Sequence, residues 1–245
     1  MLETWRFKAA KPIPAGVVEA LYSYVPGGPG PRPGTRRFHI LYRDATRLAR
    51  SFDLDEVRRA FDRDLSMTVG STARRRVFVH AGVVSFNDGA ILIPGKSFSG
   101  KTTLVRALVD EGGVYYSDEY AVLDSRGRVS PWAEALSIRA NGALEAAQSH
   151  SPEALGLKVG RKALPVRMIV LTSFEDGKRF RPRSMSPAAG ALGLLEHTLP
   201  AQTRPRATLR ALASAVLGAQ VIRGARGEAR DAARAIVKAL EPRFG

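Results

Sequence analysis

One segment of the chain has the residue types and spacing of a phosphate-binding loop. Residues 95–102 read Gly-Lys-Ser-Phe-Ser-Gly-Lys-Thr and fit the pattern G-x-x-x-x-G-K-[ST] at every fixed position. Gly95 permits a tight turn out of a strand, and Gly100 lets backbone N–H groups approach an anion without an intervening side chain. These N–H groups would form an anion nest at the start of the next helix, where the helix dipole also favours negative charge. We expect Lys101 to reach the β- and γ-phosphates of a nucleotide and the Thr102 hydroxyl to ligate Mg²⁺.

The motif predicts that the protein binds a nucleoside triphosphate, taken as ATP with Mg²⁺. The residues expected to bind it are Gly95, Lys96, Ser97, Phe98, Ser99, Gly100, Lys101, Thr102 and Thr103. Such a loop does not specify a reaction, because a further acidic group is needed to hold the metal or to activate a nucleophile.

Adjacent carboxylates supply the best candidate for that acidic group. Asp118 and Glu119 follow a predicted strand at residues 114–116, and carboxylates at the end of a strand beside the loop can approach Mg²⁺ and the γ-phosphate. Glu175 and Asp176, after a predicted strand at 168–172, are the competing pair, although their Lys- and Arg-rich surroundings are typical of a surface loop.

The histidines give a weaker signal than the acids. His80 lies in a predicted strand at residues 77–86, where a lone histidine is more often structural than catalytic. His39, His150 and His197 have no spacing suited to a metal site. With no cysteine, the chain has neither a disulfide framework nor a thiolate metal site, and no nucleophile constellation for hydrolysis is visible.

The elements that must position these residues alternate between strands and helices. A strand at 77–86, the turn signal Asn-Asp-Gly at 87–89 and a buried strand at 90–93 form a predicted hairpin that leads into the glycine loop. A helix is expected at 102–109, a hairpin from 121–123 and 128–132, and later helices at 187–197, 204–217 and 228–240. Before them, the Pro- and Gly-rich loop 26–34 interrupts a region with a predicted strand at 37–42 and a predicted helix at 55–64. The pattern predicts an α/β fold with an N-terminal α+β region, 1–72, of unknown role, and a nucleotide-binding domain, 73–245.

The bulk composition limits the partners. The formal charge of +15 could attract nucleic acid or acidic substrates, but the arginines are scattered and few aromatic residues lie among them. The exceptions are the clusters at 74–76 and 178–183. A nucleic-acid partner is therefore not favoured. The longest apolar runs, such as 211–222, fall short of the roughly 20 residues that a bilayer requires, so no membrane partner and a cytoplasmic location are expected.

Three segments taken together resemble the HPr kinase/phosphorylase family, which shares a P-loop core with ATP-dependent phosphoenolpyruvate carboxykinase. They are His-Ala-Gly at 80–82, the run from Ile91 to Thr103, and Tyr-Ser-Asp-Glu at 116–119; residues 136–139 also resemble a family segment that ends in Arg. The resemblance covers residues 77–139 and implies a P-loop kinase core with a mixed sheet. It further implies phosphoryl transfer from ATP to a hydroxyl, classically a serine of a protein.

The resemblance also assigns roles by position. Lys101 and Thr102 would hold phosphate and Mg²⁺; of Asp118 and Glu119, one would be linked to the metal and the other would be the general base. The predicted metal ligands are Thr102 and Asp118, and His80 would support the acid pair. The chain departs from the family in having Asp-Glu where Asp-Asp is common, in carrying Ser137 in place of a metal-binding glutamate, and in lacking an evident signature for recognising HPr.

Four functions remain open at this stage. The first is a kinase that acts on a peptide or protein hydroxyl, possibly of an acidic acceptor, and the second is a small-molecule kinase. The third is a switch that hydrolyses a nucleotide slowly to control a partner, although no Asn-Lys-x-Asp motif for guanine is visible. The fourth, a nucleic-acid-binding ATPase, rests on charge alone. The sequence does not indicate the oligomeric state.

Overall fold

The computed structural model describes residues 5–8, 39–96, 99–134, 136–138 and 148–240. The chain divides into two compact units, Met1–Val69 and Gly70–Gly245. The boundary between them falls inside helix α2 (Leu54–Thr72). The predicted loop at 26–34 lies outside the described residues.

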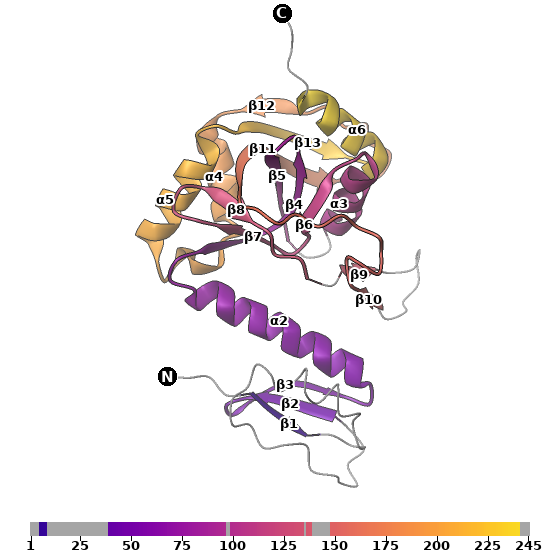
Figure 1. Cartoon of the computed structure of the whole chain (residues 1–245), viewed down its shortest axis with the longest axis vertical. Helices are drawn as coiled ribbons and strands as arrows, with labels where there is room; N and C mark the ends of the chain where they lie inside the picture. The colour runs from indigo at the N-terminus through magenta and orange to yellow at the C-terminus, as the bar shows by residue number, and fades with distance from the viewer. Residues whose placement is uncertain (1–4, 9–38, 97–98, 135, 139–147, 241–245) are drawn as a thin grey trace, which may run out of the picture. The chain divides into compact units, whose positions relative to one another are not determined.

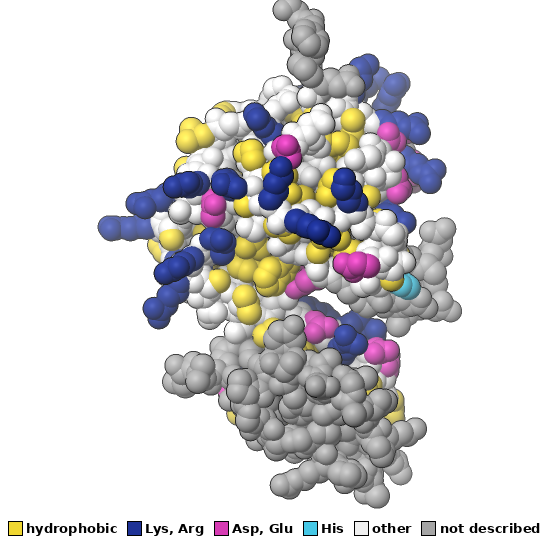
Figure 2. Space-filling view, in the orientation of Figure 1, with side chains coloured by type: hydrophobic (Ala, Val, Ile, Leu, Met, Phe, Trp, Pro, Cys, Tyr) yellow, Lys and Arg dark blue, Asp and Glu magenta, His cyan; other side chains and the backbone are white. Residues whose placement is uncertain are grey.

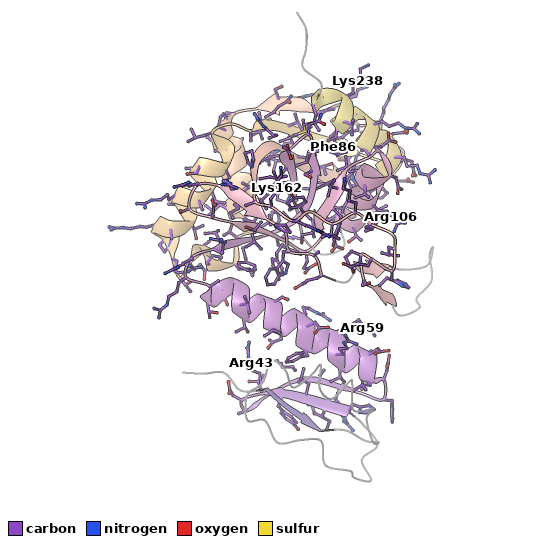
Figure 3. The ribbon with its side chains drawn as sticks, viewed as in Figure 1. Arg43, Arg59, Phe86, Arg106, Lys162 and Lys238 are labelled. Atoms are coloured by element: carbon purple, nitrogen blue, oxygen red, sulfur yellow. The ribbon has the colours of Figure 1, made fainter. Side chains whose placement is uncertain are left out.

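The first unit is a small α+β structure (Figure 1). Its strands β1 (Trp5–Lys8), β2 (His39–Arg43) and β3 (Thr46–Ser51) form an antiparallel sheet in the order β1–β2–β3. Leu41 of the sheet packs with Val57 and Phe61 of α2, and all three are buried. Arg43 points from β2 to α2, where it hydrogen-bonds Thr68 at 3.1 Å and pairs with Asp64 at 3.2 Å (Figure 3).

The second unit contains a mixed sheet with helices on both faces (Figure 1). Its strands are β4 (Val77–Phe86), β5 (Gly89–Pro94), β6 (Val114–Ser117), β7 (Tyr120–Leu123), β8 (Arg128–Ser130), β11 (Leu164–Phe174), β12 (Arg183–Met185) and β13 (Gln220–Arg226). The strand order is β12–β13–β11–β5–β4–β7–β8, with β6 also paired to β4. Strands β11 and β5 are parallel, as are β11 and β13, whereas β4 is antiparallel to β5, β6 and β7. A mixed α/β fold is therefore confirmed.

The helices cover the sheet as the alternation of apolar residues requires. Ile91 and Ile93 of β5 pack on one face with α3 (Lys101–Asp110) and α6 (Ala229–Leu240). The opposite face, which includes Leu92, packs against α4 (Pro187–Leu195) and α5 (Pro205–Val216). A short 3₁₀ helix, η1 (Leu199–Ala201), links α4 to α5. Two further strands, β9 (Leu136–Ile138) and β10 (Gln148–His150), form a separate antiparallel pair.

Strand β4 is the central support of the candidate site. Its turn to β5 has positive φ angles at Asn87 (44°) and Asp88 (59°), which suits the tight hairpin that their types predict. Its second half, from Ala81 to Phe86, pairs with β5; its first four residues pair with β7, and Val83 to Ser85 pair with β6. Residues on both sides of β4 are thereby held at fixed register to the loop that follows β5.

The structure corrects several predicted elements. Helix α2 runs to Thr72 rather than ending at residue 64. Strand β2 spans His39–Arg43, and residues 37 and 38 of the predicted strand lie outside the described residues. The predicted strand at 168–172 is the centre of a longer strand, β11. The segment 220–226, which was not predicted as a strand, forms β13, because parallel pairing with β11 at residues 168–174 satisfies its backbone.

Candidate active site

The glycine loop joins the end of β5 to the first turn of α3. At its start, the Gly95 N–H donates to the His80 carbonyl of β4 at 3.2 Å. At its end, Gly100 is the N-cap of α3 and has φ +76°, a left-handed conformation that favours glycine. Ser97 and Phe98 lie outside the described residues, while Lys96 and Thr103 are exposed. The loop thus sits in the strand-to-helix position that its motif requires.

Lys101 is a buried cation at the N-terminus of α3. Its side chain is only 7% exposed, and its ammonium donates to the Lys96 carbonyl at 2.9 Å. The same nitrogen lies 3.3 Å from His80 Nε2. Burial lowers the pKa of Lys101, while the nearby carboxylates of Glu119 and Asp118 act in the opposite direction.

Asp118 is held by two hydroxyl donors. Thr102 Oγ1 donates to Oδ2 at 3.0 Å, and Tyr115 OH donates to Oδ1 at 3.0 Å. Asp118 is only 7% exposed, and this burial raises its pKa, whereas the two hydrogen bonds oppose the shift. Because Thr102 and Asp118 bring a hydroxyl and a carboxylate oxygen together, they match the hard oxygen ligands that Mg²⁺ prefers.

Glu119 has a different partner from the buried Asp118 and is more exposed. Ser117 Oγ creates that bend by accepting the N–H groups of Glu119 and Tyr120 at 3.2 and 3.0 Å. Glu119 Oε1 lies 3.4 Å from His80 Nε2, and the Glu119 side chain is 38% exposed. Its carbonyl accepts the Ala81 N–H at 3.1 Å. The bend therefore directs one carboxylate to Thr102 and presents the other, more accessible one beside His80.

The predicted site residues fall into three groups. The structure brings Lys101, Thr102, Asp118, Glu119 and His80 together around the start of α3. Ser137 lies in β9, and nothing is described of its side chain. The competing pair is placed in an exposed loop after β11, where Glu175 pairs with Lys178 at 3.7 Å.

Three residues near the site were missed by the sequence analysis. They are Tyr115, a donor to Asp118, His197, whose carbonyl accepts the His80 N–H at 2.7 Å, and Arg226, which contacts the glycine loop. Burial lowers the pKa of His197, and the neighbouring His80 adds to the shift. Only Tyr115 had a usable signal, since it lies three residues before Asp118. The other two approach the site through tertiary contacts.

Basic side chains, rather than clusters of possible metal ligands, mark the rest of the described surface. Figure 2 shows Lys and Arg side chains spread over the visible face of the second unit, in keeping with a solvated surface. The part of the chain that the structure describes contains no group of three or more His, Cys, Asp or Glu residues placed to hold a metal. None of its helices combines the length and apolar character needed to cross a bilayer.

Comparisons with known proteins give little further guidance. No protein-family model matches the chain, and no curated protein matches its sequence. Among solved structures, the chain is similar to the Hpr(Ser) kinase/phosphatase from Coxiella burnetii, with 15% sequence identity, coverage of 66% of this chain and 94% of that chain, and a TM-score of 0.35. A likeness at this TM-score carries no conclusion about the fold or the activity of this chain.

Proposed function

We propose that the protein is an ATP- and Mg²⁺-dependent kinase that transfers the γ-phosphoryl group to a hydroxyl of a peptide or protein. The observation that carries the proposal is the 3.0 Å hydrogen bond from Thr102, at the start of α3, to Asp118, after β6. It joins the phosphate-loop motif to a buried carboxylate, and a second carboxylate lies on the adjacent residue. Phosphoryl transfer needs these three parts in one place: a phosphate cradle, a metal ligand and a base.

The chain offers separate groups for phosphate and for metal. Lys101 would leave the Lys96 carbonyl to contact the β- and γ-phosphates, and the N–H groups at the start of α3 would bind their oxygens. Thr102 and Asp118 would hold Mg²⁺, which when bound neutralises charge on the phosphate oxygens. The two hydrogen bonds to Asp118 support its charged form, as a metal ligand requires.

Glu119 is the better candidate for the general base. It is more exposed than Asp118, so an acceptor can approach it, and it lies beside His80, which can orient the carboxylate. Glu119 would take the acceptor's hydroxyl proton as the hydroxyl oxygen forms a bond to the γ-phosphorus. The bond between that phosphorus and the bridging oxygen breaks, and ADP leaves with the electron pair.

Two features favour a peptide or protein acceptor over a metabolite. One is the resemblance of the motifs to a family that phosphorylates protein serine. The other is the formal charge of +15, which would steer an acidic acceptor towards the protein. The small-molecule kinase and the hydrolytic switch remain outcomes that the experiment separates.

The test combines nucleotide binding with transfer of labelled phosphate. Lys101→Ala should fold normally and lose most transfer, and Thr102→Ala should chiefly weaken the Mg²⁺ dependence. Asp118→Asn and Glu119→Gln should keep ATP binding while cutting the chemical step by about a hundred- to ten-thousandfold. Glu175→Gln, in the competing pair, is the matched control and should be active.

The products then decide between the alternatives. With labelled ATP, Mg²⁺ and a panel of acidic and neutral peptides, we expect phosphoserine or phosphothreonine detected by mass. Full activity in Lys101→Ala, or loss of activity only in Glu175→Gln, would refute the site. Release of free phosphate without a labelled acceptor would favour the switch, and labelling of a metabolite alone would favour a small-molecule kinase.

A further inference from the structure

Arg226 is a buried cation directly behind the glycine loop. It is the last residue of β13 and only 2% exposed, and it is paired in register with Phe174 of β11. The Phe174 ring centroid lies 5.8 Å from the guanidinium carbon. An arginine so deeply buried requires a specific set of partners, because desolvation of its charge is costly.

The partners of Arg226 are backbone carbonyls. Nη2 donates to the Gly100 carbonyl at 2.8 Å and to the Ser99 carbonyl at 3.4 Å, while Nη1 donates to the Gly227 carbonyl at 3.1 Å. No carboxylate among the described residues forms an ion pair with it, and its Nε has no hydrogen-bond partner there. Burial lowers the pKa of Arg226, with the charge of Glu228 opposing that shift. Two of its three hydrogen bonds thus go to carbonyls at the end of the glycine loop.

These hydrogen bonds fix the direction of two peptide groups. In a trans peptide, the C=O of one residue and the N–H of the next point in opposite directions, and the described residues contain no cis peptide. Because the carbonyls of Ser99 and Gly100 face Arg226, the N–H groups of Gly100 and Lys101 face away from it. Neither N–H has an acceptor among the described residues. Within the described part of the chain they are therefore available as donors, as an anion nest at a helix N-terminus requires.

We infer that Arg226 is a positioning residue that orients the N–H groups of Gly100 and Lys101 for binding the phosphates of the nucleotide. That the ligand is a nucleotide phosphate rests on the proposed function, whereas the hydrogen bonds from Arg226 to the loop do not depend on it. Arg226 does not touch the phosphates; it holds the carbonyl side of the loop so that the donor side is formed before the ligand arrives. Its positive charge also favours an anion on that donor side, since no carboxylate of the described residues forms an ion pair with it.

A glycine at position 100 is consistent with this arrangement. A Cβ built on Gly100 would lie 2.5 Å from Arg226 Nη2, closer than such atoms can approach. Glycine is favoured at position 100 by the left-handed backbone, and a Cβ there would require the guanidinium to shift away from the loop. The glycine of the motif and an arginine more than a hundred residues later in the chain depend on each other.

The test uses the full chain carrying Arg226→Met or Arg226→Lys, with Arg223→Met as the control. Arg223 lies on the same strand and is exposed, so its change removes the same charge without touching the loop. The first measurement is the position of the Gly100 and Lys101 amide signals in ¹⁵N-labelled protein without ligand. The second is the affinity for inorganic tripolyphosphate with Mg²⁺, which probes the phosphate site without a nucleobase.

We expect Arg226→Met to shift both amide signals and to weaken tripolyphosphate binding by at least about tenfold. Arg226→Lys, which keeps the charge but has a single donor nitrogen, should recover part of the affinity, and Arg223→Met should change neither measurement. Unchanged amide signals, or changed signals with unchanged affinity, would overturn the inference. If Arg226→Met does not fold, the same two readings on Arg226→Lys decide. If the wild type binds neither tripolyphosphate nor ATP, the proposed function fails, and the amide signals alone test the orienting role.

Discussion

Replacing Gly100 with alanine should destabilise the second unit much more than the same change at Gly156. Both glycines have left-handed backbones, with φ +76° and +67°. A Cβ at Gly156 would meet nothing within 4 Å, whereas one at Gly100 would lie 2.5 Å from Arg226 Nη2. The pair therefore separates the general cost of the backbone conformation from the specific cost of displacing the guanidinium.

The expected difference can be worked from these contacts. An alanine in the left-handed region costs about 1–2 kcal/mol, and the reduced freedom of the unfolded chain returns about 0.4–1 kcal/mol. Gly156→Ala should therefore lower the free energy of unfolding by about 1 kcal/mol. Gly100→Ala additionally loses a hydrogen bond from a charged donor, about 1.5–3 kcal/mol, so its total loss should be about 3 kcal/mol.

Urea unfolding followed by tryptophan fluorescence measures this difference. The chain has two tryptophans, Trp5 and Trp132, of which only Trp132 belongs to the second unit. A Trp5→Phe background therefore reports on the second unit alone. The Trp132 ring is a sensitive probe, because it packs edge-on to Phe78 with centroids 5.2 Å apart. Equal losses in the two glycine variants would show that the guanidinium does not constrain the loop, and would refute the reasoning.

Three further predictions test the surroundings of the site by the same unfolding assay. Because burial lowers the pKa of His197, the native state binds a proton at this residue less readily than the unfolded chain does. The free energy of unfolding should therefore fall as the pH drops below about 6.5, and His197→Gln should flatten this pH dependence. Tyr115→Phe removes a hydroxyl that donates to the Asp118 carboxylate and should cost about 1.5–3 kcal/mol of stability. Tyr116→Phe removes a hydroxyl that donates to a backbone carbonyl and should cost about 1 kcal/mol; equal costs would contradict a charged acceptor for Tyr115. Leu104→Ala opens a cavity under α3 and should cost about 2–5 kcal/mol of stability. The control Leu209→Ala, at an exposed position, should change stability by less than about 0.5 kcal/mol. A similarly small loss for Leu104→Ala would indicate that α3 is loosely packed.

Local patterns were sufficient to predict the supports of the site. Strands β4 and β5 were predicted because their signals are local. These signals are the β-branched run at 77–86, the Asn87-Asp88 turn and the apolar run that follows it. The helix after the glycine loop follows from the same kind of local signal. The position of Asp118 and Glu119 after β6 was enough to expect them near the start of this helix. The hydrogen bond from Thr102 to Asp118 could not be predicted.

The parts that could not be predicted depend on distant contacts. The apolar run at 211–222 crosses the end of α5 and the beginning of β13, so its composition does not separate helix from strand. Arg226 resembles the other scattered arginines in sequence, and it becomes distinct only when β13 pairs with β11. Helix α2 continues through Thr68, Gly70 and Thr72, residues with poor helix propensity, so tertiary packing overrides the local preference there.

The two backbone hydrogen bonds at neighbouring residues of β4 have a consequence for the timescale of any catalytic motion. The His80 carbonyl holds Gly95 of the loop, and the Ala81 N–H holds the Glu119 carbonyl. Separating Gly95 from the Glu119 backbone therefore requires these hydrogen bonds to β4 to break, which belongs to the slow regime of local unfolding. The fast step open to the site is rotation of the Lys101 side chain away from the Lys96 carbonyl. Rotamer changes of exposed side chains take picoseconds to nanoseconds, and burial would slow this one, yet it requires no rearrangement of the sheet.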